Sequence, residues 1–315
     1  MAWVTWRQHR LQALAGGATL VLLAIGAFLT SLPIRAAYHR EALAACLPPS
    51  SRAGCDLIVR HFSNEFLTGV NGARGLAILP ALAGVFVGAP LLARELEHDT
   101  YRLAWTQAVS RQRWLLSKTG LLVAAIFLAG VAAAAITTWW RGPFDAVSGR
   151  MAPGAFDIEA AVVPAYAVFA LVIGVLAGLL LRRTIRAIAV TLVVFIAVRL
   201  VVARVVRPHF LSPVQESTVA SASPSHPRDW VLSSTLVDGT GRKITAARED
   251  LAILHAQHGH VDPQDYLDSL GWRRLVSYQP AGRFWHFQLI EAGVFLALSA
   301  LAVAAAVWAI RRTPS

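Results

Sequence analysis

The sequence predicts an all-α membrane protein with six transmembrane helices, and three observations support this prediction. Hydrophobic residues make up 56% of the 315 residues and charged residues only 15%, against about 25% charged in a soluble domain. Six apolar runs reach the length of about 20 residues that a helix needs to cross the hydrocarbon core. Their sequences lack the strict alternation of barrel strands. The runs are Leu11–Leu32, Gly75–Ala93, Thr119–Trp140, Ala160–Leu181, Ala187–Val206 and Phe287–Ile310.

The distribution of basic residues predicts that both termini lie in the cytoplasm. With the amino terminus inside, segments 1–10, 94–118, 182–186 and 311–315 hold twelve Lys and Arg in 45 residues. The outer segments are about three times longer in total and hold only 14. Because Lys and Arg concentrate in cytoplasmic loops, this asymmetry sets the orientation. The formal net charge of +11 therefore reflects topology, and no basic face with stacking aromatics indicates nucleic acid.

The first element is an N-terminal interfacial segment, residues 1–10, with two Trp and two Arg ahead of the first span. Such residues are ordinary anchors at a membrane interface, and an amphipathic helix along the inner leaflet is the alternative. Spans one to five then occupy residues 11–206. Spans two and four each carry a spacing of small residues that lets helix backbones approach closely. These residues are Gly84/Gly88 and Gly174/Gly178.

The first outer loop contains the only two cysteines of the chain, Cys46 and Cys55. Outside the cytoplasm such a pair can oxidise, and the turn-rich stretch between the two residues suits a tight loop. A disulfide is expected, with two free thiols as the alternative.

The largest outer segment, residues 207–283, precedes the last span and is long enough for a small folded unit. Its Ser/Pro-rich start predicts irregular structure, and Asp262–Val276 resembles a helix with an Asp cap. Residues 278–288 suggest a partly buried re-entrant hairpin that leads into the last helix and tail, residues 284–315.

The sequence contains no motif for nucleotide, cofactor or metal chemistry. GxxxxGK[ST] and HExxH are both absent, so any ATP and Mg²⁺ would be bound by another chain and no enzyme activity is expected here. Three His and two Asp lie between positions 255 and 265, but Gly259 and Pro263 interrupt them. Because a metal site needs fixed geometry, this group is interpreted as a solvated loop, and no metal site is predicted.

Charged residues within apolar spans raise the question of function, because they are expensive in a membrane. Arg199 in span five and Glu291 in span six each lie roughly 10 Å from the outer end of their helices, at 1.5 Å per residue. A direct ion pair between them is predicted. A role for Glu291 in gating or substrate passage, and simple interfacial placement, are the alternatives.

The inner loop at about residues 94–114 has the pattern of a short helix lying along the membrane surface. Acidic residues come first, followed by a cap and then an aromatic face at helical spacing. A second cap then precedes the third span. The residues that form this pattern are Glu95, Glu97, Thr100, Tyr101, Trp105, Ser110 and Arg111.

Residues 88–118 resemble the region between spans two and three of ABC-2 type permeases, the membrane subunits of ABC exporters. In that family an acid-x-acid pattern and Thr, then Ser-Arg and Lys, mark the coupling helix that docks on the ATPase. The matching residues are Glu95, Glu97, Thr100, Ser110, Arg111 and Lys118. The start WRQHR and the segment 278–293 also resemble actinobacterial members. The chain departs from the family pattern at His98-Asp99 and at Ala108.

The resemblance implies a permease subunit of an exporter in the plasma membrane that moves an amphiphilic or drug-like compound. Its partners would be a separate ABC ATPase subunit and a second permease copy, as homodimer or heterodimer. A non-transporting membrane sensor or anchor, with residues 207–283 as its extracytoplasmic domain, is the alternative.

Overall fold

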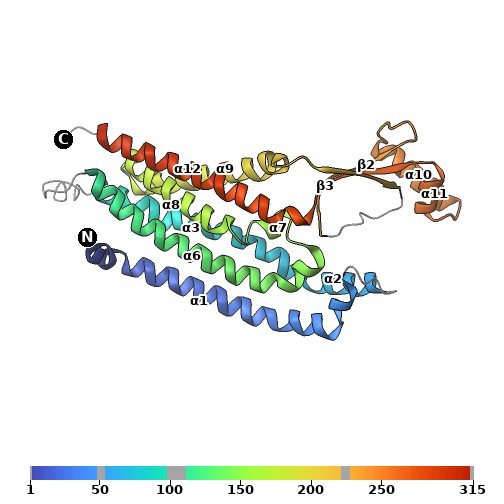
Figure 1. Ribbon diagram of the computed structural model, residues 1–315, viewed down its shortest axis with the longest axis horizontal. Coiled ribbons are helices and arrows are strands. Elements are labelled where there is room, and N and C mark those ends of the chain that lie inside the picture. The colour runs from blue at the N-terminus through green and yellow to red at the C-terminus, as the bar shows by residue number, and fades with distance from the viewer. Residues whose placement is uncertain (1, 48–53, 98–110, 221–227, 313–315) are drawn as a thin grey trace.

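A computed structural model describes residues 2–47, 54–97, 111–220 and 228–312 of the chain. Long helices form an elongated bundle, and a small unit of strands and short helices extends from one end (Figure 1). Helix α1 begins and helix α12 ends at the opposite end of the bundle. We name these two ends the sheet end and the terminal end.

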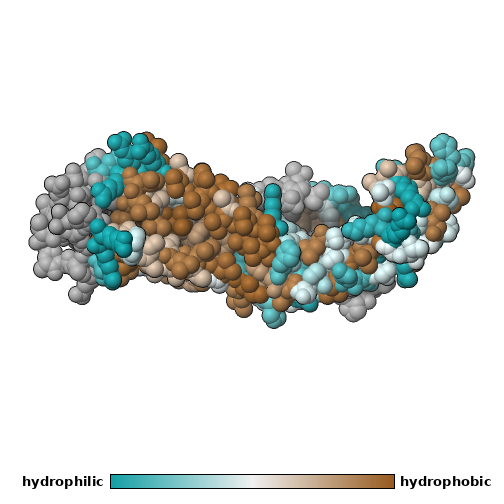
Figure 2. Space-filling model, turned by 90° about the horizontal axis from the view of Figure 1, so that it is seen from above, coloured by the Kyte–Doolittle hydropathy of each residue, from teal (hydrophilic) through white to brown (hydrophobic). Residues whose placement is uncertain are grey.

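Six helical segments within the described residues are long and apolar enough to cross a membrane, as predicted. Hydrophobic residues cover the bundle as a broad belt, with polar residues on both sides of it (Figure 2). A belt of this kind fits a bilayer. Helices suit this environment because they satisfy their backbone hydrogen bonds internally, where the hydrocarbon core offers no water. The six segments are Arg10–Arg40, Gly75–Arg94, Leu115–Ser148, Val162–Leu181, Thr184–His209 and Ala281–Arg312.

Three of these segments are single helices. They are α1 (Ala2–Arg40), which includes most of the predicted N-terminal segment, α6 (Arg111–Ser148) and α8 (Val162–Leu181). The sixth segment comprises the short η6 (Ala281–Arg283) and α12 (Phe284–Arg312). The second segment is composite and comprises η2 (Arg74–Ile78), α3 (Leu79–Ala83), the π-helical η3 (Gly84–Gly88) and α4 (Ala89–Glu97). The fifth comprises α9 (Thr184–Val201), the π-helical η4 (Val202–Val206) and η5 (Arg207–His209).

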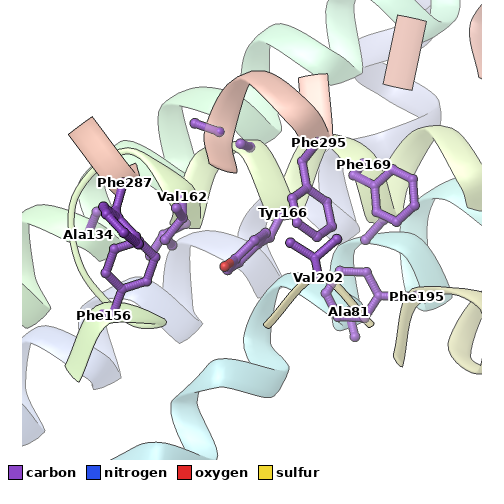
Figure 3. Close-up of a cluster of buried hydrophobic side chains, with 14 of the residues drawn as sticks. Ala81, Ala134, Phe156, Val162, Tyr166, Phe169, Phe195, Val202, Phe287 and Phe295 are labelled. Atoms are coloured by element: carbon purple, nitrogen blue, oxygen red, sulfur yellow. The ribbon is translucent and has the colours of Figure 1, made fainter. Parts of the chain in front are cut away.

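Helix α8 is the centre of the bundle. Sixteen of its twenty residues are buried, and it contacts α3, η3, α4, α6, α9 and α12. Around it, aromatic side chains from several helices interlock, with Tyr166 and Phe169 against Phe295 of α12 and Phe195 of α9 (Figure 3). Because α8 is apolar on all sides, it is buried by its neighbours while their outer faces remain for lipid.

The small-residue spacings of spans two and four lie at close helix contacts, and the two spans pack against each other. A Cβ added at Gly88 would lie 2.3 Å from the carbonyl oxygen of Leu171, and one at Gly178 would lie 2.6 Å from that of Ala89. Both distances are far below van der Waals contact. The backbones of η3, α4 and α8 are therefore as close as glycine allows, and the three elements pack as one block.

Cys46 and Cys55 form a disulfide with a Cα–Cα distance of 5.3 Å, which is the first of the two expected alternatives. The disulfide joins the short helix η1 (Leu43–Cys46), which follows α1, to the start of α2 (Cys55–Ala73). An aromatic cluster of Tyr38, Phe62, Phe66 and Phe144 packs α1, α2 and α6 together beside it.

The unit at the sheet end contains a three-stranded antiparallel sheet, so the protein is not wholly α-helical. Strands β1 (Val214–Val219) and β2 (Trp230–Val237) both pair with β3 (Arg273–Gln279), in the order β1–β3–β2. Helices α10 (Ala246–His258) and α11 (Pro263–Ser269) precede β3. The small core of the unit consists of Ala220, Leu236, Ala252, Leu267 and Trp272.

Three sequence predictions within residues 207–283 are wrong. The start of the segment, predicted as irregular, contains β1. The helix predicted over Asp262–Val276 ends at Ser269, because Gly271 takes a φ of +68° and turns the chain into β3. The predicted re-entrant hairpin is instead the end of β3, the turn η6 (Ala281–Arg283) and the start of α12. Strand formation here depends on pairing between distant segments, which a single sequence shows poorly.

Candidate functional site

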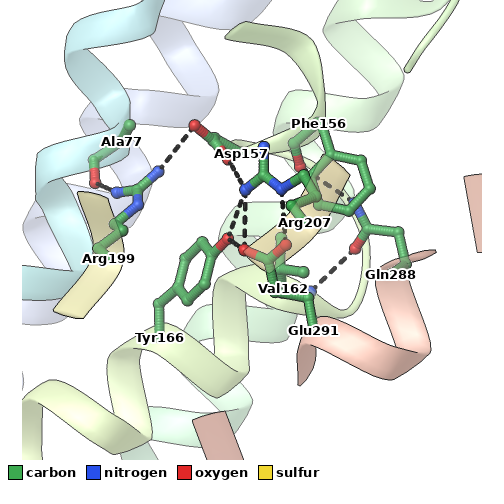
Figure 4. Close-up of polar contacts among 9 residues, drawn as sticks. All are labelled: Ala77, Phe156, Asp157, Val162, Tyr166, Arg199, Arg207, Gln288 and Glu291. Carbon is green, nitrogen blue, oxygen red and sulfur yellow. Dashed lines mark hydrogen bonds and ion pairs between the residues drawn. The ribbon is translucent and has the colours of Figure 1, made fainter. Parts of the chain in front are cut away.

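A cluster of charged and polar side chains lies within the bundle near the sheet end. It contains Asp157, Tyr166, Arg199, Arg207 and Glu291, and we name it the α9–α12 cluster (Figure 4). Asp157 follows the short helix α7 (Pro153–Phe156) in the connection between α6 and α8. Buried charges are tolerated when they are paired and hydrogen-bonded. Each charged side chain of this cluster has an oppositely charged partner, and among the atoms of Arg207 only Nη1 is buried without a hydrogen-bond partner.

Arg207 is the centre of the cluster, and its side chain is only 1% exposed. Its Nε lies 2.6 Å from Oε2 of Glu291 and its Nη2 2.8 Å from Oε1, so the pair is bidentate. Nη2 also donates to Oδ1 of Asp157 at 2.6 Å. The guanidinium stacks over the Phe156 ring, with 4.3 Å between Cζ and the ring centroid. A bidentate, charge-assisted contact of this kind is among the strongest that side chains make.

Tyr166 and Arg199 complete the cluster. The Tyr166 hydroxyl donates to Glu291, and the Arg199 guanidinium lies over the Tyr166 ring at 4.6 Å. Nη2 of Arg199 lies 3.3 Å from Oδ2 of Asp157, and Nη1 donates to the carbonyl oxygen of Ala77. The cluster therefore joins the second span, α8, α9 and α12 to the α6–α8 connection.

The predicted direct pair between Arg199 and Glu291 is wrong. Arg199 pairs with Asp157, while Glu291 pairs with Arg207. Both residues do belong to one network, because Asp157 contacts both arginines. Depth along the two helices placed Arg199 and Glu291 in the same network, and the intervening partners Asp157 and Arg207 came from segments predicted to be outer loops.

A second buried group, named here the α6 cluster, lies beside the first. Arg141 donates through Nε to Oε1 of Glu159 at 2.5 Å and pairs with Asp145 at 3.2 Å. Arg150 donates to Oε2 of Glu159 at 2.8 Å. Its guanidinium also lies 4.1 Å from the centroid of the Phe284 ring of α12. Glu159 is fully buried, and the two arginines provide the charge that its burial requires.

The connection between α6 and α8 supplies a carboxylate to each cluster. Asp157 belongs to the α9–α12 cluster, and Glu159, two residues later, belongs to the α6 cluster. Several contacts hold it in place. Gln288 of α12 donates to the carbonyl oxygen of Phe156 and accepts from the backbone N–H of Val162, both at 3.0 Å. Ala160 takes a positive φ of 51°, a conformation that a non-glycine residue adopts only when its surroundings require it.

Sequence reasoning missed Asp157, Glu159, Arg141 and Arg207 as site residues, because all four lie at the edges of apolar runs. One signal was available. The chain has only 18 acidic residues, and two of them border the start of the most buried span. An acid pair at that position is unusual enough to suggest partners within the bundle.

The terminal end of the bundle carries the described part of the predicted coupling segment. Glu97 is the last residue of α4, and its Oε2 accepts from the backbone N–H of Thr184 at 3.2 Å and from its hydroxyl at 2.9 Å. Thr184 is the first residue of α9. A carboxylate at a helix N-terminus satisfies free N–H groups and interacts favourably with the helix dipole. The end of α4 is therefore attached to the start of α9.

The other predicted coupling residues fall largely outside the described structure. Thr100, Tyr101, Trp105 and Ser110 lie outside the described residues. Glu95 lies within α4 and Arg111 begins α6, and the structure describes only the backbone of these two residues. Their role in coupling stays a prediction.

Six apolar helices with polar clusters sealed among them define a multi-pass membrane protein. Residues 17–207 match the family model described as ABC-2 membrane transporter related, and the chain belongs to this family. The chain is thus a membrane permease component of an ABC transporter. Searches of curated proteins and of solved structures gave no match. The matched range ends at Arg207, so the sheet unit and α12 lie beyond it.

Proposed function

We propose that this chain is the permease of an exporter in the plasma membrane, driven by ATP that a separate ATPase subunit binds with Mg²⁺ and hydrolyses. Family membership is the observation that carries the proposal. The absence of GxxxxGK[ST] from the sequence agrees with it, because the phosphate-binding loop must then come from a partner. A second permease copy is expected to complete the pathway, since six helices enclose little space.

The contacts of α9 support a route by which movement at the terminal end reaches the α9–α12 cluster. Glu97 attaches α4 to the start of α9, and close backbone packing joins α4 to α8. Near the other end of the fifth span, Arg207 pairs with Glu291 of α12, and both Arg199 and Arg207 pair with Asp157 of the α6–α8 connection. A push on α4 would therefore move α8 and α9 together and strain the ion pair between Arg207 and Glu291.

An apolar cavity agrees in its lining with an amphiphilic cargo, and it is smaller than the roughly 300–1,000 Å³ of a pocket that encloses a drug-sized ligand. Its volume is about 100 Å³, and it lies between α1, the second span, α6 and α8. All its lining residues are apolar except Thr137 and Asp157. Ligand sites of this kind combine apolar walls with a few polar groups that fix orientation. Asp157 also belongs to the α9–α12 cluster, so a ligand in the cavity would touch the network that joins α9 to α12.

Copurification tests the proposed function against the alternative of a non-transporting sensor or anchor, for which the folded sheet unit would be the external domain. Extraction of the tagged chain from its native membrane in mild detergent is expected to recover an ATPase subunit in a fixed ratio. The purified complex, reconstituted in vesicles, is expected to hydrolyse ATP faster when amphiphiles are added. Recovery of the chain without an ATPase would favour the sensor.

Glu97→Ala is expected to uncouple ATP hydrolysis from cargo, because it removes the hydrogen bonds from Thr184 that attach the end of α4 to the start of α9. Amphiphile-stimulated ATPase activity should fall about tenfold, within the range of typical coupling energies. Glu97→Gln keeps an acceptor oxygen and should retain most of the stimulation. Asp250→Ala, at an exposed acid of α10, is the control. A Glu97→Ala complex that assembles and responds to cargo like the wild type would contradict the route through α9.

A further inference from the structure

Three metal-ligating side chains meet where the chain leaves α1 and enters α2, and we propose that they bind a divalent transition metal of the zinc type. They are Glu41, His61 and Glu65, each with one ligand atom within 4.8 Å of the other two. Glu41 directly follows α1, while His61 and Glu65 are four residues apart on one face of α2. The sequence predicts no metal site here, because Glu41 is twenty positions from His61.

The Glu41 carboxylate provides the strongest indication of a missing ligand. Its side chain is only 16% exposed, and its Oε2 is buried without a hydrogen-bond partner. The other oxygen lies 3.9 Å from Nη2 of Arg40, a side chain that is 67% exposed. An unsatisfied carboxylate oxygen is costly to bury. A cation held between Glu41, His61 and Glu65 would satisfy it.

The surrounding structure fixes the two segments that carry these ligands. The Cys46–Cys55 disulfide joins the chain five residues after Glu41 to the first residue of α2. Phe62, next to His61, is fully buried, with its ring centroid 6.3 Å from that of Tyr38 of α1 and 5.5 Å from that of Phe144 of α6. The disulfide and the packing of Phe62 hold the backbone of both segments in place, so the ligand side chains are close to one another before the metal binds.

The ligand chemistry favours zinc over calcium or magnesium. Zn²⁺ binds both imidazole nitrogen and carboxylate oxygen, and three protein ligands can leave its fourth position open, whereas Ca²⁺ and Mg²⁺ prefer oxygen ligands alone. Bonds of about 2.0–2.1 Å in a tetrahedral site place two ligand atoms about 3.4 Å apart. His61 and Glu65 are exposed, so their side chains can rotate to close the remaining gap.

A metal at this position would cross-link α1 to α2. Helix α1 packs mainly against α6 and has much of its surface exposed in the described structure. Its last turn would gain a second attachment near the sheet end. Metal binding should therefore stabilise the outer part of α1 against separation from the bundle.

Zinc titration of the full-length, oxidised protein in detergent tests the site. Calorimetry is expected to show one Zn²⁺ per chain, and the Tm should rise with added zinc. His61→Ala and Glu65→Gln change exposed side chains, so folding should be preserved while zinc affinity falls at least tenfold. His39→Ala, an exposed histidine of α1 near the site, is the matched control and should bind zinc like the wild type.

Three results would overturn the proposal. The first is a wild-type protein whose Tm and calorimetric heats do not respond to zinc. The second is unchanged zinc affinity in both His61→Ala and Glu65→Gln. The third is binding of Ca²⁺ at the site with no binding of Zn²⁺, which would exclude the histidine as a ligand.

Discussion

Arg207→Met is expected to destabilise the folded bundle by roughly 3–5 kcal/mol, the cost typical of breaking a buried ion pair from one side. The substitution leaves Glu291 fully buried without its bidentate partner and removes one of the two arginines that contact Asp157. A Met side chain fills much of the same space, so most of the destabilisation should come from the loss of the charge rather than from the loss of volume. Denaturant unfolding in mild detergent measures the difference in free energy of unfolding.

Two further variants show whether the effect of Arg207→Met comes from the unpaired carboxylate. Arg204→Met removes an exposed arginine three residues away and should change stability by less than about 0.5 kcal/mol. Adding Glu291→Gln to Arg207→Met removes the orphaned charge and should recover part of the lost stability. If Arg207→Met unfolds at the same denaturant concentration as Arg204→Met, the α9–α12 cluster does not hold the helices together.

The six spans were predictable because membrane crossing depends on the length and composition of one continuous segment. Each predicted run, from Leu11–Leu32 to Phe287–Ile310, lies wholly or almost wholly within an apolar helical segment of the structure. The close contact of Gly88 with α8 was also predictable as a tendency, because small residues at a spacing of four create a flat helix face. Its partner was less certain, since such spacings are common in Ala- and Gly-rich helices.

The sheet and the polar clusters were harder to predict, because both depend on contacts between distant segments. Strand β1 pairs with β3, about sixty residues further along the chain, and neither strand has a distinctive pattern alone. Hydropathy locates the end of a span only within a few residues. It placed Asp157 and Arg207 outside the membrane-spanning runs, although both contact residues within them. Because Asp157 and Arg207 lie just outside the predicted spans, hydropathy alone could not identify them as the partners of Arg199 and Glu291.

Gly88→Leu is expected to separate α4 and η3 from α8 and to prevent normal folding of the bundle. Even a Cβ at position 88 would lie 2.3 Å from the carbonyl oxygen of Leu171 and 3.1 Å from its Cα. These are backbone atoms of a central helix, so no side-chain rotation can relieve the clash. Gly88→Ala should already cost about 1–3 kcal/mol, as overpacking does, and Gly88→Leu substantially more.

Gly120→Leu provides the matched control for Gly88→Leu, because a Cβ at position 120 of α6 would meet nothing within 4 Å. Replacing an exposed glycine within a helix should leave stability unchanged or raise it by up to about 1 kcal/mol, through better helix propensity. The Tm in detergent and the yield of monodisperse protein measure both variants. Helix association in a membrane depends on close packing more than on the hydrophobic effect, so only Gly88→Leu should lose its folded bundle. Equal Tm values for the two variants would mean that α4 and α8 can move apart at little cost, and coupling through a rigid α4–α8–α9 block would then be untenable.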